Sequence, residues 1–153
     1  MEALTFQQFI TEVNRTYKEE DDFYRRLARR SGLSDAAFWV LYSIETAPGP
    51  VTQTDIGNTL MLSKQTINSA LKQLEHSGHI CLTDGPGRKK YLQLTQQGRA
   101  LSDRAIRPTL EVERGAFLGL AEEERASLLA LDRKYLSLLL QKSEQIFNIS
   151  QEE

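Results

Sequence analysis

The segment from Ser63 to Gly78 restricts the possible folds and functions of this chain more than any other segment. Its apolar residues recur at the spacing of one helix face, so we predict a helix with one buried side. Ser63 is the expected N-cap of this helix, and Gly78 is its expected end. These apolar residues are Ile67, Ala70, Leu71 and Leu74. The other side is polar or basic and has no acidic residue between Ser63 and Leu74. An ordinary solvated helix face usually contains Glu as well as Lys, so this pattern favours a surface that contacts a polyanion.

The polar side of this predicted helix has the side chains that reading double-stranded DNA requires. Amide groups can hydrogen-bond to base edges, short hydroxyl side chains let a helix lie deep in the major groove, and lysines can reach phosphates. The candidate DNA-binding residues on this helix are Ser63, Lys64, Gln65, Thr66, Asn68, Ser69 and Lys72. The alternative interpretation is a solvated helix face without a ligand.

A basic β-hairpin is predicted directly after this helix. Two extended runs, 79–83 and 88–95, flank a turn rich in Gly and Pro at 84–87. A basic tip on such a ribbon can enter the minor groove, where the negative potential favours arginine. The candidate residues at this tip are Arg88, Lys89 and Lys90. The alternative is a charged turn that only maintains solubility.

The charge of the chain is unevenly distributed. The formal net charge is −2, but the segment from Thr52 to Arg99 has six basic and three acidic residues, a charge of +3 that leaves −5 for the rest. A basic surface on an acidic body suits a nucleic-acid reader, because phosphate contacts supply most of the non-specific affinity. Chance scatter of charges is the alternative.

Helices are also predicted before this region. An apolar repeat at helical spacing predicts a long first helix over about 4–30. Ser34 is the expected N-cap of a short, strongly apolar second helix. Thr52 is the expected N-cap of a third helix, with Asp55 three residues later in a capping-box arrangement.

The pattern after the hairpin is again helical. It starts at Gln96, and Gly98 is expected to weaken its first turn. A break is expected over about 115–120, before three acidic residues at 122–124 that suit a helix N-terminus. The last helix has more leucines over 128–140 than one face of an isolated helix can bury.

The order of these elements resembles the multiple-antibiotic-resistance regulator (MarR) family of winged helix proteins. The resemblance rests on the polar-faced helix over 63–75 with Gly78 after it, and on the Arg-x5-Leu-Thr-x-x-Gly run that begins at Arg88. The layout covers nearly the whole chain. It implies a mainly α fold with a small β-hairpin wing, in which long N- and C-terminal helices flank a winged helix-turn-helix.

The resemblance also implies a domain organisation. Residues 1–153 would form a single domain, with the winged helix-turn-helix lobe at about 34–97. The first helix, at about 4–30, and the last helices, at about 98–148, would form the interface of a homodimer. A dimer would explain the surplus leucines, because a monomer would expose them.

By the same resemblance, the chain would be a transcriptional regulator, most simply a repressor, that binds double-stranded DNA. The segment from Thr52 to Met61 would be the first helix of the helix-turn-helix, and Ser63 to His76 would lie in the major groove. Arg88 would be the wing-tip arginine. A two-fold dimer would read a pseudo-palindrome with half-sites one helical turn apart. The wing differs from the family pattern at Pro86, where members often have Asp, and at Leu82, where many have a basic residue.

Many members of the family release DNA when a small aromatic or phenolic effector binds. The resemblance implies a pocket between the dimer helices and the DNA-reading lobe. The candidate pocket residues are Tyr24, Phe38, Trp39 and Tyr42. The alternative is that these aromatic residues are part of the core, as aromatic residues at helical spacing usually are.

Other classes of protein find little support in the sequence. Cys81 has no orienting group at a recognisable spacing for nucleophilic catalysis, and we expect neither an enzyme nor a cofactor. His76, His79 and Cys81 make a weak metal-ligand set, so no metal is expected. No apolar run is long enough to span a membrane, and a lone cysteine without a secretory signal suggests the cytoplasm. A winged helix that binds only proteins is the second functional hypothesis.

Overall fold

The structure is a computed structural model that describes residues 3–149, without the side chains of 144, 145 and 147–149. The chain divides into two compact units, Met1–Leu110 and Glu111–Glu153. Within the described residues, no helix is both long enough and apolar enough to cross a membrane.

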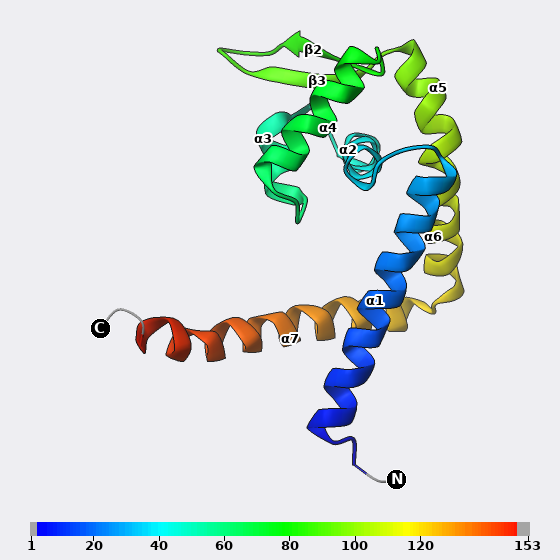
Figure 1. Cartoon of the computed structure of the whole chain (residues 1–153). Coiled ribbons are helices and arrows are strands. Elements are labelled where there is room, and N and C mark those ends of the chain that lie inside the picture. Colours follow the sequence, from blue (N-terminus) through cyan, green and yellow to red (C-terminus); the bar gives the residue numbers. More distant parts are fainter. Residues whose placement is uncertain (1–2, 150–153) are drawn as a thin grey trace. The chain divides into compact units, whose positions relative to one another are not determined.

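The elements follow the predicted order, and the mainly α fold with a small β wing is confirmed (Figure 1). The helices are α1 (Phe6–Arg30), α2 (Asp35–Thr46), α3 (Gln53–Thr59), α4 (Lys64–His76), α5 (Gln96–Ala105), α6 (Arg107–Gly119) and α7 (Glu122–Ile149). The strands are β1 (Val51–Thr52), β2 (Ile80–Asp84) and β3 (Lys90–Leu94). The boundary between the two units lies inside α6.

Three predicted N-caps are confirmed. The hydroxyl groups of Ser34, Thr52 and Ser63 each accept a hydrogen bond from the backbone N–H three residues later. Such caps satisfy N–H groups that a helix leaves without an internal partner at its start. The first helix begins at Phe6 rather than Leu4, because Thr5 forms a capping box with Gln8.

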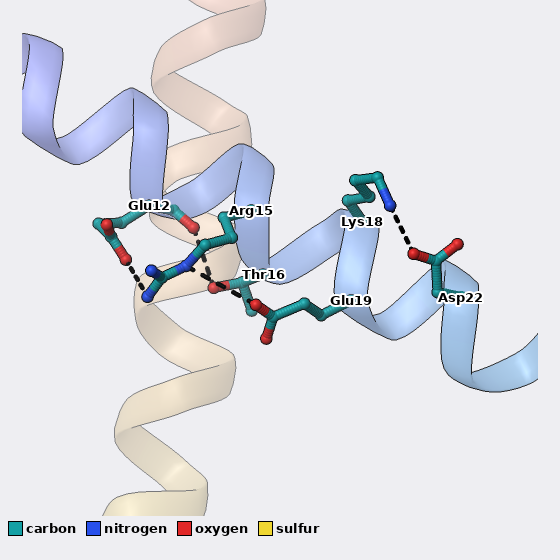
Figure 2. Close-up of polar contacts among 6 residues, drawn as sticks. All are labelled: Glu12, Arg15, Thr16, Lys18, Glu19 and Asp22. Carbon is teal, nitrogen blue, oxygen red and sulfur yellow. Dashed lines mark hydrogen bonds and ion pairs between the residues drawn. The ribbon is translucent and has the colours of Figure 1, made fainter.

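The exposed surface of α1 has charge pairs within the helix. Arg15 contacts Glu12 at 2.6 Å, and Lys18 contacts Asp22 at 2.5 Å (Figure 2). This pair raises the pKa of Lys18 and lowers the pKa of Asp22, chiefly through the hydrogen bond between them. Pairs this exposed contribute little to stability, so α1 depends mainly on its contact with the core.

The core is centred on α2. Phe38, Val40 and Leu41 are completely buried, and α2 contacts α1, α3, α4 and α5. A helix with neighbours on most sides must be apolar on most sides, which explains the short, strongly apolar run in the sequence. Because α2 also packs directly against α4, the core determines the position of the polar-faced helix.

The sheet has three strands rather than the two of the predicted hairpin. Strands β2 and β3 pair antiparallel from Ile80 opposite Leu94 to Asp84 opposite Lys90. The short strand β1 adds to the other edge of β3, with Thr52 opposite Tyr91. Strand β1 has only two residues, too few to produce an alternating pattern. It connects the hairpin directly to the start of α3.

Gly98 has a different role from the weak point that its sequence position suggests. A Cβ atom at this position would lie 1.8 Å from the carbonyl oxygen of His79. The first turn of α5 therefore packs closely against the backbone between α4 and β2. Thr95 strengthens this junction, because its hydroxyl donates to the carbonyl of Gly78 at 2.5 Å and accepts from the N–H of Gly98 at 3.0 Å.

The second unit consists of most of α6 and all of α7. The expected break over 115–120 is wrong in extent, because α6 continues to Gly119 and the interruption falls at Leu120 and Ala121. Arg125 stabilises this corner: its Nε donates to the carbonyl of Phe117 at 2.8 Å, and its guanidinium lies 4.0 Å from the centre of the Phe117 ring. The acidic first turn of α7 is confirmed.

Candidate nucleic-acid interface

The two sides of α4 are oriented as the sequence predicts. All four residues of the apolar stripe are buried, and Ile67 is only 2% exposed. The polar side faces solvent, with Asn68 half-buried and six other candidate residues exposed. The exposed candidates are Ser63, Lys64, Gln65, Thr66, Ser69 and Lys72.

The start of α4 is held by two of these candidates. The Ser63 hydroxyl accepts from the N–H of Thr66 at 3.1 Å and lies 2.7 Å from the Thr66 hydroxyl. Both side chains therefore stabilise the helix end. In contrast, Gln65 forms no side-chain hydrogen bond with any other described residue and remains available to a ligand.

The exposed side of α4 is a ridge between two hollows. One hollow, of about 460 Å³, lies toward α3 and is lined by Gln53, Lys64 and Asn68 among others. The other, of about 470 Å³, lies toward the start of α2 and is lined by Ser34 and Gln65 among others. Because the major groove admits one α-helix, a helix that projects between hollows has the shape needed to enter it.

Gln53 is a polar residue of this surface that the sequence analysis missed. It is the first residue of α3, and its Nε2 donates to the Oδ1 of Asn68 on α4. Fifteen residues separate the two in sequence. No periodic pattern relates positions so far apart on different helices, so only the packing of α3 against α4 could show that they meet.

The turn of the wing presents two of its three basic candidates to solvent. The N–H of Gly85 donates to the carbonyl of Lys89 at 2.9 Å, and Gly87 takes a left-handed φ of 71°. Arg88 and Lys89 lie in this turn and are exposed. Lys90 is the first residue of β3 and pairs with Asp84 across the hairpin, so its charge is already partly compensated.

The wing turn and the start of α3 interact electrostatically. Asp55 accepts from the hydroxyl of Thr52 at 2.7 Å and from its N–H at 2.8 Å, which completes the predicted capping box. These hydrogen bonds lower the pKa of the Asp55 carboxyl, and the charge of Lys89 lowers it further. Strand β1 joins the wing to the start of α3, and α3 in turn contacts α4.

The four aromatic effector candidates lie together where α1 meets α2. The ring centres of Tyr24 and Trp39 are 4.8 Å apart, and those of Trp39 and Tyr42 are 5.3 Å apart. Phe38 is completely buried, whereas the other three are half-buried and pack against the core. The geometry thus agrees with a structural role for Phe38, whereas the other three remain partly exposed residues.

The residues considered as metal ligands are not brought together. Among the described residues, no group of three His, Cys, Asp or Glu side chains could hold a metal ion. The Nδ1 of His79 instead lies 2.6 Å from the hydroxyl of Ser77. Cys81 is a free, half-buried thiol in β2.

Helix α3, the turn after it and α4 form a helix-turn-helix, and β2 and β3 form its wing, so the fold is a winged helix-turn-helix. Comparison with known proteins agrees with this description: the model of the MarR family matches residues 31–89, so this lobe is similar to that family. The match runs from the residue after α1 to the turn of the wing.

Relatives of known structure or name agree with this assignment. NMB1585, a MarR family regulator from Neisseria meningitidis, has a TM-score of 0.70 and 27% identity, covering 96% of this chain and 97% of that one. The transcriptional regulator PecS of Dickeya dadantii is 34% identical to this chain over 87 residues. The aligned segment covers 56% of this chain and 52% of PecS, so this chain matches about half the length of that relative. The S. aureus MepR–DNA complex shares the fold, with a TM-score of 0.64 and 22% identity over 89% of this chain and 97% of that one.

Proposed function

We propose that this chain is a sequence-specific transcriptional regulator, most simply a repressor, that binds double-stranded DNA as a homodimer. The observation that carries the proposal is the ridge of α4, whose exposed side has no acidic residue between Ser63 and Leu74. An exposed basic turn joins the two strands of the wing that follows this helix. A relative of the same fold has been solved in complex with DNA, which supports this function.

In this proposal the residues of the surface divide into two groups by role. Gln65 and Ser69 point from the exposed side of α4 toward base edges, while Lys64 and Lys72 bind phosphates. Arg88 and Lys89 in the wing turn enter the minor groove, where the charge of an arginine is favoured. Lys90 contributes less, because Asp84 competes with DNA for its charge.

Dimerisation through the first and last helices is proposed from exposed apolar surface. Within the described residues of α7, seven leucines are exposed, more than a monomer in water would be expected to carry. They are Leu128, Leu129, Leu131, Leu136, Leu138, Leu139 and Leu140. A second copy of the chain would cover them and would place two α4 helices for a pseudo-palindrome with half-sites one helical turn apart.

A small aromatic or phenolic effector is proposed to act at the aromatic cluster of α1 and α2. Tyr24, Trp39 and Tyr42 are only half-buried, and an aromatic ligand can stack against them. Helix α2 contacts both α1 and α4, so a ligand that moves α2 would also move the reading helix. Quenching of the Trp39 fluorescence by salicylate, followed by release of bound DNA, is the result expected. An unchanged DNA affinity at saturating ligand would reject this part of the proposal.

The decisive experiment is a selection from random duplex DNA, with the bound fraction sequenced at two salt concentrations. We expect enrichment of a pseudo-palindrome and an affinity that falls steeply as salt rises, because phosphate contacts release counterions. The Lys64→Ala and Arg88→Ala variants should bind more weakly. If these variants and the wild type retain the same weak binding without enrichment, the chain is instead a winged helix that binds proteins.

A further inference from the structure

Gln53 and Asn68 form an amide pair that joins α3 to α4. The Nε2 of Gln53 donates to the Oδ1 of Asn68, and both residues line the hollow on the α3 side of the ridge. Gln53 is exposed and Asn68 is half-buried, so a ligand that contacts the ridge can reach the pair.

The fold holds the backbone of both residues in place. Gln53 follows directly on β1 and on the capping box of Thr52, so its backbone is held at two points. Asn68 lies next to Ile67, whose side chain is buried in the core. On α4 it is four residues from Lys64 and four from Lys72, so these three side chains lie along one strip of the helix surface.

The hydrogen bond determines what the pair can offer to a base. A side-chain amide has one carbonyl oxygen and two N–H groups. With one donor of Gln53 and the Asn68 oxygen engaged with each other, the pair presents the Gln53 oxygen as an acceptor beside the Asn68 nitrogen as a donor. Rotating both amides reverses the bond, and the pair again presents one acceptor beside one donor.

We propose that Gln53 determines DNA sequence specificity together with Asn68, and that the linked pair reads one adenine as a unit. In the major groove adenine presents the N6 donor and the N7 acceptor side by side, which is the complement of the pair. Gln53 thereby extends the reading surface beyond α4 to the first residue of α3. The proposal rests on the proposed DNA-binding function.

A purely structural role for the pair makes a different prediction. If the hydrogen bond served only to join α3 to α4, replacing Gln53 would lower stability and affinity for every sequence alike. If the pair reads adenine, replacing either member changes the preference at one and the same position of each half-site. The Gln53→Glu variant distinguishes further between the structural role of the pair and its role in reading a base. A carboxylate can only accept, so Asn68 must donate to it, and the pair then presents acceptors suited to the N4 amine of cytosine.

The test is the random-duplex selection carried out with the full chain and five variants. These are Gln53→Ala, Asn68→Ala, the double variant, Gln53→Glu, and Asn58→Ala as a control from the same hollow. We expect a roughly tenfold adenine preference in the wild type at one position. Both single alanine variants should lose it there, the double variant should lose no more, and Gln53→Glu should favour cytosine. The Asn58→Ala control should retain the wild-type preference.

The outcomes distinguish failure of this proposal from failure of the proposed function. An unchanged preference in a folded Gln53→Ala variant, with enrichment by the wild type, would overturn the role of the pair and leave DNA reading intact. Losses at different positions in the two single variants would also overturn it. If the wild type enriches no sequence, the proposed function fails and the role of the pair fails with it. Thermal melting of each variant establishes that it is folded.

Discussion

Neighbouring basic residues of the wing differ in what surrounds their charges. Lys90 pairs with Asp84 across the hairpin, whereas Arg88 lies exposed in the turn. Both follow the Gly-Pro-Gly tip in the sequence, and only the family resemblance distinguishes Arg88 as the wing-tip arginine. The structure therefore ranks Arg88 above Lys90 as a contact to DNA.

Replacing Arg88 with Ala should weaken DNA binding across all sequences. An arginine that contacts phosphates or the minor groove contributes mainly charge, so the slope of log affinity against log salt should fall by about 1. Binding titrations at several salt concentrations measure this slope. Lys18→Ala removes the same charge from α1, where Lys18 is paired with Asp22, and should leave the slope unchanged. Equal effects of both variants would contradict a direct contact by Arg88.

Replacing Gln65 with Ala should relax sequence preference rather than abolish binding. Gln65 is exposed on the ridge of α4 with no side-chain partner among the described residues, so it can hydrogen-bond to a base without losing another bond. A good base contact contributes about 1–3 kcal/mol of discrimination. Competition between the selected operator and single-base variants gives this value. Discrimination equal to that of the wild type at every position would show that Gln65 does not read a base.

At the scale of the elements, the junctions determine where the reading surface lies. The capping box of α3 begins that helix beside β1, and the close approach at Gly98 places α5 against the base of the wing. Neither junction contacts DNA in the proposed function. Substitutions at these two junctions should therefore lower the stability of the fold before they affect DNA binding.

The capping box of α3 should make stability depend on pH in the acid range. The hydrogen bonds from Thr52 lower the pKa of Asp55 below its ordinary value of 3.8. The stabilising contribution is therefore complete above that ordinary value and is lost as pH falls through the lowered pKa of the folded state. In urea unfolding, Asp55→Ala should be less stable than the wild type near neutral pH. The difference should shrink as pH falls below the ordinary value of 3.8 and through the lowered pKa of the folded state. A constant difference at all pH values would contradict this origin.

Replacing Gly98 with Ala should destabilise the fold substantially. The added Cβ would lie 1.8 Å from a backbone oxygen, so α5 or the turn at His79 must move. Overpacking of this kind costs about 1–3 kcal/mol. Gly115→Ala on α6 is the matched control, since a Cβ there meets no atom within 4 Å, and it should be neutral or stabilising by up to about 1 kcal/mol. Similar unfolding midpoints for both variants would show that the junction adapts freely.

For the whole molecule, the main question is what covers the exposed leucines of α7. We expect the wild type to sediment as a dimer and to dissociate when charge is placed on that surface. The double variant Leu136→Glu, Leu139→Glu should be monomeric and should lose most operator binding, because half-sites then bind independently. Lys142→Glu on the same helix is the control for charge alone. A wild type that sediments as a monomer at all concentrations tested would reject the dimer.

Much of this architecture could be predicted because it depends on local chemistry. The caps at Ser34, Thr52 and Ser63 and the stripe that includes Ile67 follow from spacing along one segment. The extent of α6 could not be predicted, because Gly115 weakens a helix without necessarily ending it. Strand β1 was missed because two residues show no alternation. The expected contacts of the candidate residues with DNA, a second copy and an effector stay predictions.

The sequence by itself determined which segments are helices, which side of α4 is buried, and that a basic hairpin follows it. Those properties depend on periodicity, caps and turn residues, which act over a few neighbouring positions. Only the tertiary structure decided that Gln53 meets Asn68 and that Gly98 is required by the close approach of His79. It also decided that Lys90 pairs with Asp84, whereas Arg88 has no ion pair among the residues that the structure describes. Each of these depends on how separate elements pack or pair, and no spacing along the chain specifies the distance between side chains on different elements.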